Sequence, residues 1–385
     1  MFDIFDFCHL FVKKFVILRQ NYHIMNLLEI VSAFAIDCQV DRIEPLGNGL
    51  INDSFKVFVV GSNVPKYVLQ RINNSIFTDV DMLQDNIDKV TSHIHNKMLD
   101  KGEKDIERKV LRFLRTKDGK LYHFADGKYW RMMLFIPDSY TYEAVTPEYS
   151  YYAGKAFGEF QSLLSDMEQP LGEVLPNFHN IEFRLSQLRD AVRENRCGRV
   201  GEVQHFIDAI EEKAEMMCLS ERLYREGKLP KRVCHCDTKV NNMLFDSDGN
   251  VLCVIDLDTV MPSFVFSDFG DFLRSAANTG AEDDKCLDNI DFNMEIFEAF
   301  AKGYLIGTKD FLTDIEKENL PYAALLFPYM QTVRFLADYI NGDKYYKIKY
   351  PEHNLVRTKA QWRLFERAEQ KKHEMKRIIS SIKIS

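Results

Sequence analysis

Residues 233–245 of this chain read VCHCDTKVNNMLF, and residues 251–258 read VLCVIDLD. These two runs decide the fold. The Asp-Gly pair at 248–249 lies between them, and such a pair suits the tight turn of a hairpin because glycine tolerates a positive φ. Together the runs give the pattern His-x-Asp-x-x-x-x-Asn, then a hairpin, then an apolar strand that ends in aspartate.

The polar residues of these runs have the spacing that phosphoryl transfer from ATP requires. Asp237 is placed to sit beside an acceptor hydroxyl and take its proton. Asn242 and Asp256 supply the amide and carboxylate oxygens that suit Mg²⁺. Lys239 can neutralise charge on the transferring phosphoryl group. The alternative is a polar turn between two buried strands, and the second aspartate at one hairpin's distance argues against it.

The cysteines allow a second interpretation of the same segment. Cys234 and Cys236 flank His235, and such a group can indicate zinc. Neighbouring strand residues point to opposite faces, so three such ligands do not converge easily, and no second Cys/His cluster completes a set of four. The eight cysteines are scattered, unlike those of a small disulfide scaffold, so we expect reduced thiols and a cytoplasmic protein.

The periodicity changes along the chain. Residues 40–136 hold short alternating runs and Gly-rich turns, which predict a mainly antiparallel sheet with one inserted helix over 79–98. Another helix is predicted over 26–37. The fold class is therefore α+β, with a small antiparallel β-rich N-lobe over 25–136 and a larger, mainly helical C-lobe over 137–385. Helical periodicity in the C-lobe covers 147–167, 180–226, 290–304, 319–340 and 359–382, interrupted by a strand-and-loop island at 231–260.

The composition and net charge exclude several classes of protein and make some binding partners unfavourable. The hydrophobic fraction of 46% and the charged fraction of 28% exclude a disordered, collagen-like or coiled-coil chain. The net charge of −8 makes nucleic acid a poor partner. No apolar run approaches the roughly 18 residues that span a bilayer, so no membrane segment is expected. Residues 1–24 lack the pattern of a signal peptide and are expected to be either an upstream extension, with Met25 as the start, or a short amphipathic helix.

Three stretches of the C-lobe carry a family resemblance: HCDTKVNNMLF at 235–245, VIDLDTVMP at 254–262 and SDFGDFLR at 267–274. They resemble the aminoglycoside phosphotransferase and choline kinase branch of the protein-kinase-like fold. Within that branch the chain looks closest to the N-acetylhexosamine 1-kinases. The supporting stretches, over about residues 40–365, are GNGLINDSF, YVLQRIN, YWRMMLFIPDSYTYE, PNFHNIEFR and RFLADYINGDKYYKIKYPEHNLVR.

The resemblance implies a bilobal protein-kinase-like fold and a Mg²⁺- and ATP-dependent kinase. Its acceptor would be a small molecule with a hydroxyl group, N-acetylglucosamine or N-acetylgalactosamine, phosphorylated at the anomeric position. Two alternatives stay open: a kinase of an amino alcohol, a homoserine-like metabolite or an aminoglycoside, and a nucleotide-binding scaffold without turnover. The oligomeric state is left open.

The resemblance also assigns roles in the catalytic runs. Asp237 matches the catalytic aspartate, and Asn242 and Asp256 match the magnesium ligands. His235 matches a loop histidine that braces the backbone near the metal-binding aspartate. Asp258 would bind a second ion or a metal-bound water, or lie in solvent.

Two further roles concern the segment after these runs. Asp268 matches an aspartate that accepts hydrogen bonds from the backbone of the catalytic loop, and Asp271 is the rival for that role. Arg274 would meet a phosphate or sugar oxygen, or pair with Asp271 three residues earlier.

The N-lobe departs from the protein-kinase pattern in its phosphate-binding segments. Gly47-Asn48-Gly49 provides two glycines, and Asn52 stands where a third would be. Asn52 and Ser54 would add hydrogen-bond donors over the phosphates.

The third strand departs from the pattern as well. Gln70 replaces the usual phosphate-anchoring lysine, and Arg71 would substitute only if the register shifted by one residue. The helix over 79–98 has no glutamate to pair with such a cation. At the end of the β region, Leu134 and Ile136 are expected to lie in the hinge behind adenine.

The acceptor pocket is expected to form from C-lobe segments that carry amide and cationic groups. These suit an N-acetyl sugar better than an aminoglycoside, which would need clustered carboxylates. The candidates are His179, Asn180, Arg184, Arg274, Arg334, Asp338, Asn341 and His353.

Overall fold

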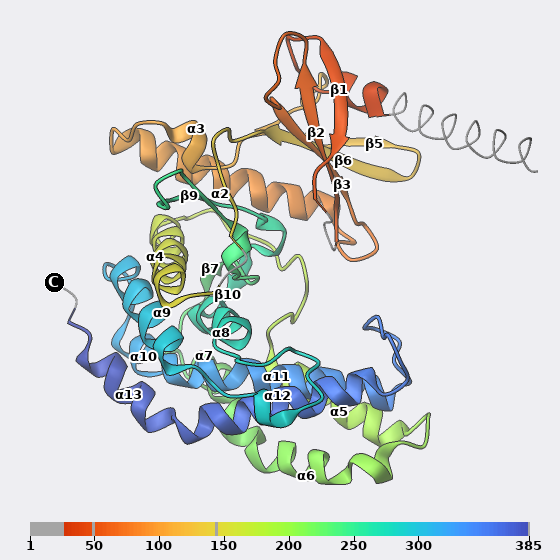
Figure 1. The fold of residues 1–385 in the computed structure, drawn as a ribbon, viewed down its shortest axis with the longest axis vertical. Coiled ribbons are helices and arrows are strands. Elements are labelled where there is room, and N and C mark those ends of the chain that lie inside the picture. Colours follow the sequence, from red (N-terminus) through yellow and green to blue (C-terminus); the bar gives the residue numbers. More distant parts are fainter. Residues whose placement is uncertain (1–26, 48–50, 143–144, 384–385) are drawn as a thin grey trace, which may run out of the picture. The chain divides into compact units, whose positions relative to one another are not determined.

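The computed structural model describes residues 27–47, 51–142 and 145–383. The chain divides between Asp138 and Ser139 into two compact units, each described by itself (Figure 1). The expectations for residues 1–24, Asn48 and Gly49 lie outside the described residues.

Unit 1 is built on an antiparallel sheet with the strand order β1-β2-β3-β6-β4, and β5 pairs with β6. The β5–β6 turn has positive φ at Asp126 (52°) and Gly127 (71°), which matches the right-handed twist of a two-residue hairpin. The strands are β1 (Val40–Pro45), β2 (Asp53–Val59), β3 (Tyr67–Ile72), β4 (Phe113–Leu114), β5 (His123–Ala125) and β6 (Lys128–Leu134).

Helical residues 27–32 pack on one face of this sheet, where Leu27, Ile30 and Val31 join Leu69 and Trp130 in a common core. The helix predicted over 26–37 therefore ends early. Phe34 forms an isolated β-bridge with Thr116 instead of continuing the helix.

The inserted helix of unit 1 is α2 (Val80–Asp100), and a short helix, α3 (Ile106–Lys109), follows it. The carboxylate of Asp79 accepts a hydrogen bond from the Met82 N–H at the N-terminus of α2. The buried residues Leu83, Ile87 and Val90 lie on one side of α2, as helical periodicity predicts.

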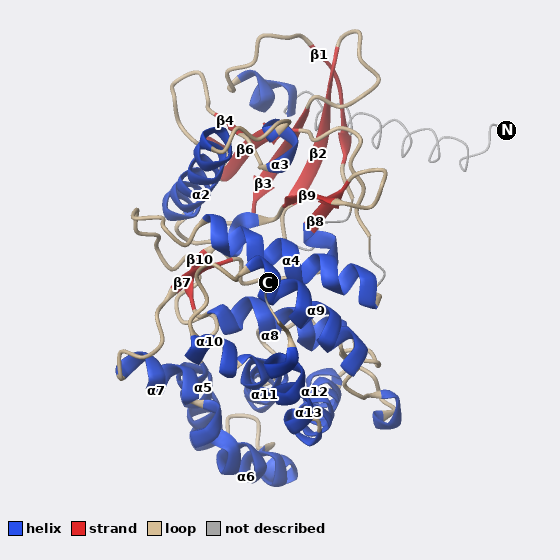
Figure 2. Ribbon diagram, turned by 90° about the vertical axis from the view of Figure 1, so that its left-hand side faces the viewer, coloured by secondary structure: helices blue, strands red, loops and turns tan. Residues whose placement is uncertain are grey.

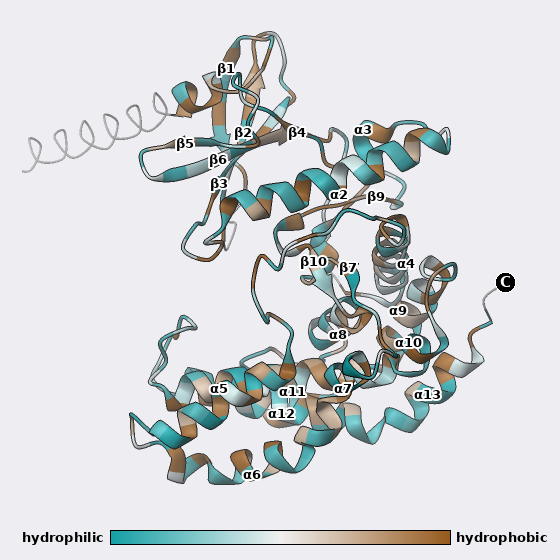
Figure 3. Cartoon of the chain, turned by 180° about the vertical axis from the view of Figure 1, so that it is seen from behind, coloured by the Kyte–Doolittle hydropathy of each residue, from teal (hydrophilic) through white to brown (hydrophobic). Residues whose placement is uncertain are grey.

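Unit 2 is mainly helical (Figure 2). The stretch predicted over 180–226 breaks into three helices. The first break follows the left-handed φ angles of Asn195 (39°) and Gly198 (69°), and the second lies at Cys218, which ends α6 and precedes α7. Figure 3 shows hydrophilic and hydrophobic residues alternating along α6. The helices are α4 (Pro147–Leu163), α5 (Ile181–Glu194), α6 (Val200–Met217), α7 (Leu219–Arg225), α8 (Val265–Ala276), α9 (Met294–Gly307), α10 (Asp314–Glu318), α11 (Leu320–Ile340), α12 (His353–Gln370) and α13 (Lys372–Ser381).

Helices α4 and α9 approach each other closely through glycines. A Cβ atom at Gly158 would lie 2.8 Å from the Tyr304 carbonyl oxygen, and one at Gly307 would lie 2.6 Å from the Lys155 carbonyl oxygen. Gly154 and Gly303 face the opposite backbone in the same way. The backbones of the two helices therefore meet without side chains between them.

The island between α7 and α8 consists of two short antiparallel pairs. β7 (Arg232–Cys234) pairs with β10 (Met261–Ser263), and β8 (Met243–Phe245) pairs with β9 (Val251–Val254). The 3₁₀ turns η1 (Val240–Asn242) and η2 (Leu257–Thr259) connect them. No helix in the described part of the chain is long and apolar enough to cross a membrane.

Candidate active site

The segment after β7 is held by a buried carboxylate. Asp268, in the first turn of α8, accepts hydrogen bonds from the backbone N–H groups of His235 (2.9 Å) and Cys236 (2.7 Å). Its Oδ2 also accepts a bond of 2.7 Å from the Gln161 amide, and Gln161 accepts one of 2.6 Å from the Tyr304 hydroxyl. Burial raises the pKa of Asp268.

A second aspartate of α8 holds the next part of this loop. The Thr238 N–H donates to Asp271 Oδ2 at 3.0 Å, and the Thr238 hydroxyl donates to the Asp268 carbonyl at 2.8 Å. Burial raises the pKa of Asp271 to about 6; Arg274 opposes this shift and Asp237 adds to it. Both rivals from the sequence thus accept backbone hydrogen bonds from the loop.

His235 joins the loop to the strand that ends at Asp256. The ring is fully buried, and its Nδ1 lies 3.3 Å from the Asp237 backbone N–H, which can only donate. Nδ1 is therefore the acceptor, and Nε2 carries the proton that is donated to the Ile255 carbonyl at 2.9 Å. This arrangement fixes the tautomer and places Asp237 relative to Asp256.

Asp237 is the polar centre of the loop. Its Oδ1 lies 2.6 Å from Lys239 Nζ, and its side chain is 25% exposed, so a ligand can reach the carboxylate. The Asn242 amide donates to the Asp237 carbonyl at 2.7 Å and to Asp237 Oδ2 at 3.4 Å. Burial works to lower the pKa of Lys239, but the charge of Asp237 outweighs it and the net pKa is raised.

Two oxygen donors lie on adjoining segments as a candidate Mg²⁺ site. The Ile255 N–H donates to the Asn242 carbonyl at 2.9 Å, which ties the two segments together, and Asp256 follows with a left-handed φ of 61°. The negative charge of Asp256 also acts on Lys239. An amide oxygen and a carboxylate fit Mg²⁺, which takes one or two protein carboxylates and completes its shell with water and phosphate. Residues 27–47, 51–142 and 145–383 contain no group of three or more His, Cys, Asp or Glu that could hold a metal.

Asp258 and the two loop cysteines are buried. Asp258 is 4% exposed in η2, which removes the alternative that it lies in solvent. Burial raises the pKa of the Cys234 and Cys236 thiols well above their usual range, so both stay protonated. Cys234 donates to the Phe264 carbonyl at 3.3 Å.

In unit 1, Gln70 lies in a polar row that crosses three strands. The Gln70 amide donates to the Ser54 hydroxyl at 2.9 Å and accepts from Arg131 Nε at 3.0 Å. Arg131 is 2% exposed, and its guanidinium lies over the Phe113 ring. Arg131 is not among the residues predicted from the sequence, where its signal is a lone cation in the apolar strand YWRMML.

Arg71 lies on the opposite face of β3 from Gln70 and forms an ion pair with Asp53, its register partner in β2. It therefore does not replace the missing lysine by a register shift. The side-chain amide oxygen of Asn52 accepts a hydrogen bond of 2.9 Å from the backbone N–H of Asn73, so this side chain has a structural partner.

The remaining unit 1 candidates are in turns and strand ends. Gly47 has a left-handed φ of 65° in the turn after β1. The Leu134 N–H donates to the Arg112 carbonyl at 2.9 Å, so it is not offered to a ligand, and Ile136 is buried.

Three of the acceptor candidates have structural partners. Asp338 accepts hydrogen bonds of 2.9–3.0 Å from the N–H groups of residues 344–346 and one of 2.9 Å from the Asn354 amide. His353 is fully buried and lies 2.8 Å from Asp283. Asn341 is the C-cap of α11. Asp338 and His353 thus have structural partners, and their expected contact with a substrate stays a prediction.

The other acceptor candidates gather in unit 2. The positive charges of Arg184, Arg274 and Arg334 all act on His179. Arg274 Nη2 lies 3.6 Å from Asp271 Oδ1, which connects this group to the catalytic loop. A cavity of about 240 Å³ nearby is lined by Val145, Lys239, Val240, Asn241, Phe272, Ser275 and Ala276.

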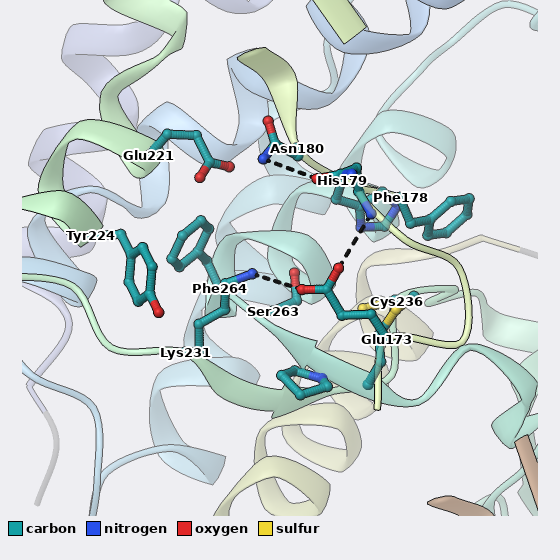
Figure 4. Close-up of a pocket in the computed structure, with 13 residues that line it drawn as sticks. Glu173, Phe178, His179, Asn180, Glu221, Tyr224, Lys231, Cys236, Ser263 and Phe264 are labelled. Atoms are coloured by element: carbon teal, nitrogen blue, oxygen red, sulfur yellow. Dashed lines mark hydrogen bonds and ion pairs between the residues drawn. The ribbon is translucent and has the colours of Figure 1, made fainter. Parts of the chain in front are cut away.

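A separate cavity of about 160 Å³ lies beside the β7–β10 pair (Figure 4). Lys231 projects into it, 3.5 Å from Glu173 and over the Phe264 ring. This cavity is lined by Cys236 of the catalytic loop but not by Asp237. The acceptor candidates His179 and Asn180 also line it, together with Glu173 and Glu221.

Residues 42–310 match the model of a family described as the phosphotransferase enzyme family. The chain belongs to this family. It is therefore a small-molecule phosphotransferase, an enzyme that moves a phosphoryl group to a hydroxyl acceptor.

Solved structures show the same fold. An aminoglycoside phosphotransferase from Alicyclobacillus acidocaldarius has a TM-score of 0.58 at 14% identity, covering 91% of this chain and 96% of that chain. A spectinomycin phosphotransferase has a TM-score of 0.52 at 14% identity, with coverages of 93% and 98%. A choline kinase from Cryptosporidium parvum has a TM-score of 0.52 at 16% identity, with coverages of 87% and 90%. The expected protein-kinase-like α+β fold is confirmed.

Proposed function

We propose that this phosphotransferase moves the γ-phosphate of ATP to the anomeric hydroxyl of an N-acetylhexosamine, either N-acetylglucosamine or N-acetylgalactosamine. The product is the sugar 1-phosphate. The observation that carries the proposal is the accessible Asp237 carboxylate, paired at 2.6 Å with Lys239 and bordered by Asn242. Residues 25–136 would form the nucleotide-binding lobe, and residues 137–385 would form the lobe with the catalytic, metal and acceptor sites.

ATP and Mg²⁺ are the cofactors in this proposal. The spectinomycin phosphotransferase of the same fold is described in complex with ADP. Asn242 and Asp256 would hold Mg²⁺, which when bound neutralises charge on phosphate oxygens.

Each residue of the loop has a defined task. Asp237 accepts the proton of the acceptor hydroxyl, which makes that oxygen a better nucleophile. Lys239 keeps its charge at neutral pH because its pKa is raised, and it offsets negative charge on the transferred group. Asp268 and Asp271 hold the loop backbone through hydrogen bonds, so Asp237 and Lys239 need to move little during the reaction.

The charge of the candidate acceptor region supports an uncharged sugar. The positive charges of three arginines act on His179, and two of them, Arg184 and Arg334, have no carboxylate in ion-pair distance among the described residues. An aminoglycoside or a choline-like acceptor is a cation and would be repelled by such a group. An N-acetyl sugar offers carbonyl and hydroxyl oxygens that accept hydrogen bonds from guanidinium groups.

The test is ATP turnover against an acceptor panel with Mg²⁺, with the products identified by phosphorus NMR. The panel contains N-acetylglucosamine, N-acetylgalactosamine, their methyl glycosides, choline, homoserine and kanamycin. We expect a sugar 1-phosphate from the free sugars and none from the methyl glycosides, which have no free anomeric hydroxyl. Phosphorylation of an amine-bearing acceptor instead would contradict the proposed acceptor. The Asp237→Asn enzyme controls for contaminating kinases.

A further inference from the structure

Arg184 of α5 and Arg334 of α11 both contact Phe178, whose ring stacks on His179 at 4.3 Å between ring centroids. The charge of Arg274 of α8 also acts on His179, and the three residues are called here the arginine cluster. Helices α5 and α8 both pack against α11, which brings the three side chains together. The views in Figures 1 and 2 place these helices within unit 2.

The three guanidinium groups differ in their partners. Arg274 pairs with Glu282 at 2.8 Å and with Asp271 at 3.6 Å. Arg184 donates to the Phe178 carbonyl at 2.9 Å, and Arg334 donates to the Gln331 amide oxygen at 3.1 Å. Within the part of the chain that the structure describes, no carboxylate lies in ion-pair distance of Arg184 or Arg334.

The charges of Arg184 and Arg334 act on each other. Burial and then the charge of Arg334 lower the pKa of Arg184 to about 10. Burial, followed by the three arginines, lowers the pKa of His179 well below its usual range, so its ring is neutral. Its buried Nδ1 has no hydrogen-bond partner among the described residues. Two like charges and an unpartnered nitrogen together indicate a binding site for an oxygen-bearing group.

An aromatic ring completes the site. The Arg334 guanidinium lies 5.6 Å from the ring centroid of Tyr346, whose hydroxyl accepts from the Gln331 amide at 3.3 Å. Asp338 holds the backbone of this segment through the bonds to residues 344–346. The position of Tyr346 is therefore set by α11 itself.

We propose that Arg184 and Arg334 form a charge-selective acceptor subsite, which binds a neutral or anionic oxygen-rich group and excludes an ammonium group. The inference rests on the proposed function, and it distinguishes an N-acetylhexosamine from the free hexosamine, which carries a protonated amine. The subsite adjoins the catalytic loop, because Arg274 contacts Asp271 and Asp271 accepts the Thr238 N–H.

The first test compares kcat/KM for N-acetylglucosamine and glucosamine at pH 7.0. We expect the wild-type ratio to exceed about 100 and to fall at least about tenfold in Arg184→Gln and in Arg334→Gln, because like-charge repulsion is relieved. Arg334→Lys, which keeps the charge, should retain most of the ratio. Arg193→Gln is the matched control, since Arg193 lies on α5 with a side chain that is 73% exposed. An equal ratio in all five enzymes would overturn the proposal.

The same ratio of kcat/KM values is then measured at different pH values, over a range in which the amine of glucosamine loses its proton. The amine of glucosamine loses its proton as the pH rises through about 8, as α-amino groups do, so the wild-type ratio should narrow between pH 7.0 and 8.5. The groups around the subsite are the three arginines, His179, Tyr345 and Tyr346. Asp271 and Glu282 contact Arg274, and Glu173, Glu221 and Lys231 line the cavity that His179 also lines. His179 is already neutral and burial raises the pKa of Tyr346, so neither changes charge in this range. A ratio that is independent of pH would contradict charge selection.

The second test needs no sugar. Titration calorimetry with sulfate should show binding to the wild-type chain and to Arg193→Gln, and a Kd raised at least about fivefold in Arg184→Gln and Arg334→Gln. Equal sulfate affinity in all variants would overturn the subsite. If no hexosamine is phosphorylated but sulfate binding still depends on Arg184 and Arg334, the proposed function fails and the subsite stands.

Discussion

The catalytic loop and the arginine cluster lie in the same unit but are built in opposite ways. In the loop, the backbone N–H groups of His235, Cys236 and Thr238 all donate to buried carboxylates of α8. In the cluster, Arg184 and Arg334 have no carboxylate partner among the described residues. The first region is organised before any ligand binds, whereas the second retains charge that a ligand would complement. The proposals thus place chemistry in a loop whose carboxylates are hydrogen-bonded, and specificity in a cluster where two arginines lack a carboxylate partner among the described residues.

The largest expected effect comes from the centre of the loop. Asp237→Asn should lower kcat by about 10²–10⁴ with little change in stability, because the amide cannot accept the hydroxyl proton but keeps the shape of the side chain. Steady-state kinetics with the preferred acceptor measures this. Turnover near that of the wild type would show that Asp237 is not the general base. The catalytic loop would then no longer differ from the arginine cluster in the role proposed for it.

The next effect tests the support of the loop. Asp268→Asn replaces one acceptor oxygen by a donor facing the N–H groups of His235 and Cys236, and it should destabilise the fold by about 2–4 kcal/mol. Urea unfolding provides the measurement. The matched control is Asp190→Asn, on the exposed side of α5. Equal unfolding midpoints for both variants would show that the bonds to Asp268 contribute little.

A smaller effect is expected beside the arginine cluster. Asp338→Asn weakens the bonds that hold residues 344–346 and so loosens Tyr346. KM for the acceptor should rise about tenfold while kcat changes less than about twofold, because the catalytic loop is untouched. A loss confined to kcat would place Asp338 with the catalytic machinery instead.

The last effect concerns the pH dependence of stability. The pKa of Asp271 is raised by burial to about 6 in the folded state and is near 3.8 when exposed, so the folded state favours the protonated form. Its contribution to stability is complete below pH 4 and is lost as the pH rises through about 6, on the order of 2–3 kcal/mol. Asp271→Asn should remove this part of the pH dependence in unfolding experiments between pH 4.5 and 7. Parallel curves for both proteins would contradict the shift.

The two regions also differ in how far the sequence could predict them. Asp237, Asn242 and Asp256 lie within 20 residues of each other, so spacing alone places them on one loop and one hairpin. Asp268 follows on the next helix. The sequence offered Asp271 as the alternative to it, and both aspartates accept hydrogen bonds from backbone N–H groups of the loop. This part of the site could be predicted because its residues are close together in the sequence.

The acceptor side could not be predicted in the same way. His179 and Arg184 share the stretch PNFHNIEFR, but Arg274 and Arg334 come from other helices, and only the packing of α5 and α8 against α11 brings these helices together. Asp338 matched the expected chemistry, but its carboxylate is used by the backbone.

Unit 1 repeats this lesson at Gln70. The sequence showed which residue was missing from β3, and register was needed to show that Arg131 of the neighbouring strand lies beside it.

The glycine contact between α4 and α9 has a consequence for how this enzyme can evolve. Gly158 and Gly307 admit no side chain, and the helices they join carry Gln161 and Tyr304, the pair that leads to Asp268. In a library selected for new acceptors, codons at these glycines should stay unchanged, while positions 184 and 334 should tolerate many replacements. We therefore expect the contact between α4 and α9 to resist substitution, whereas positions 184 and 334 can change while the catalytic loop stays intact.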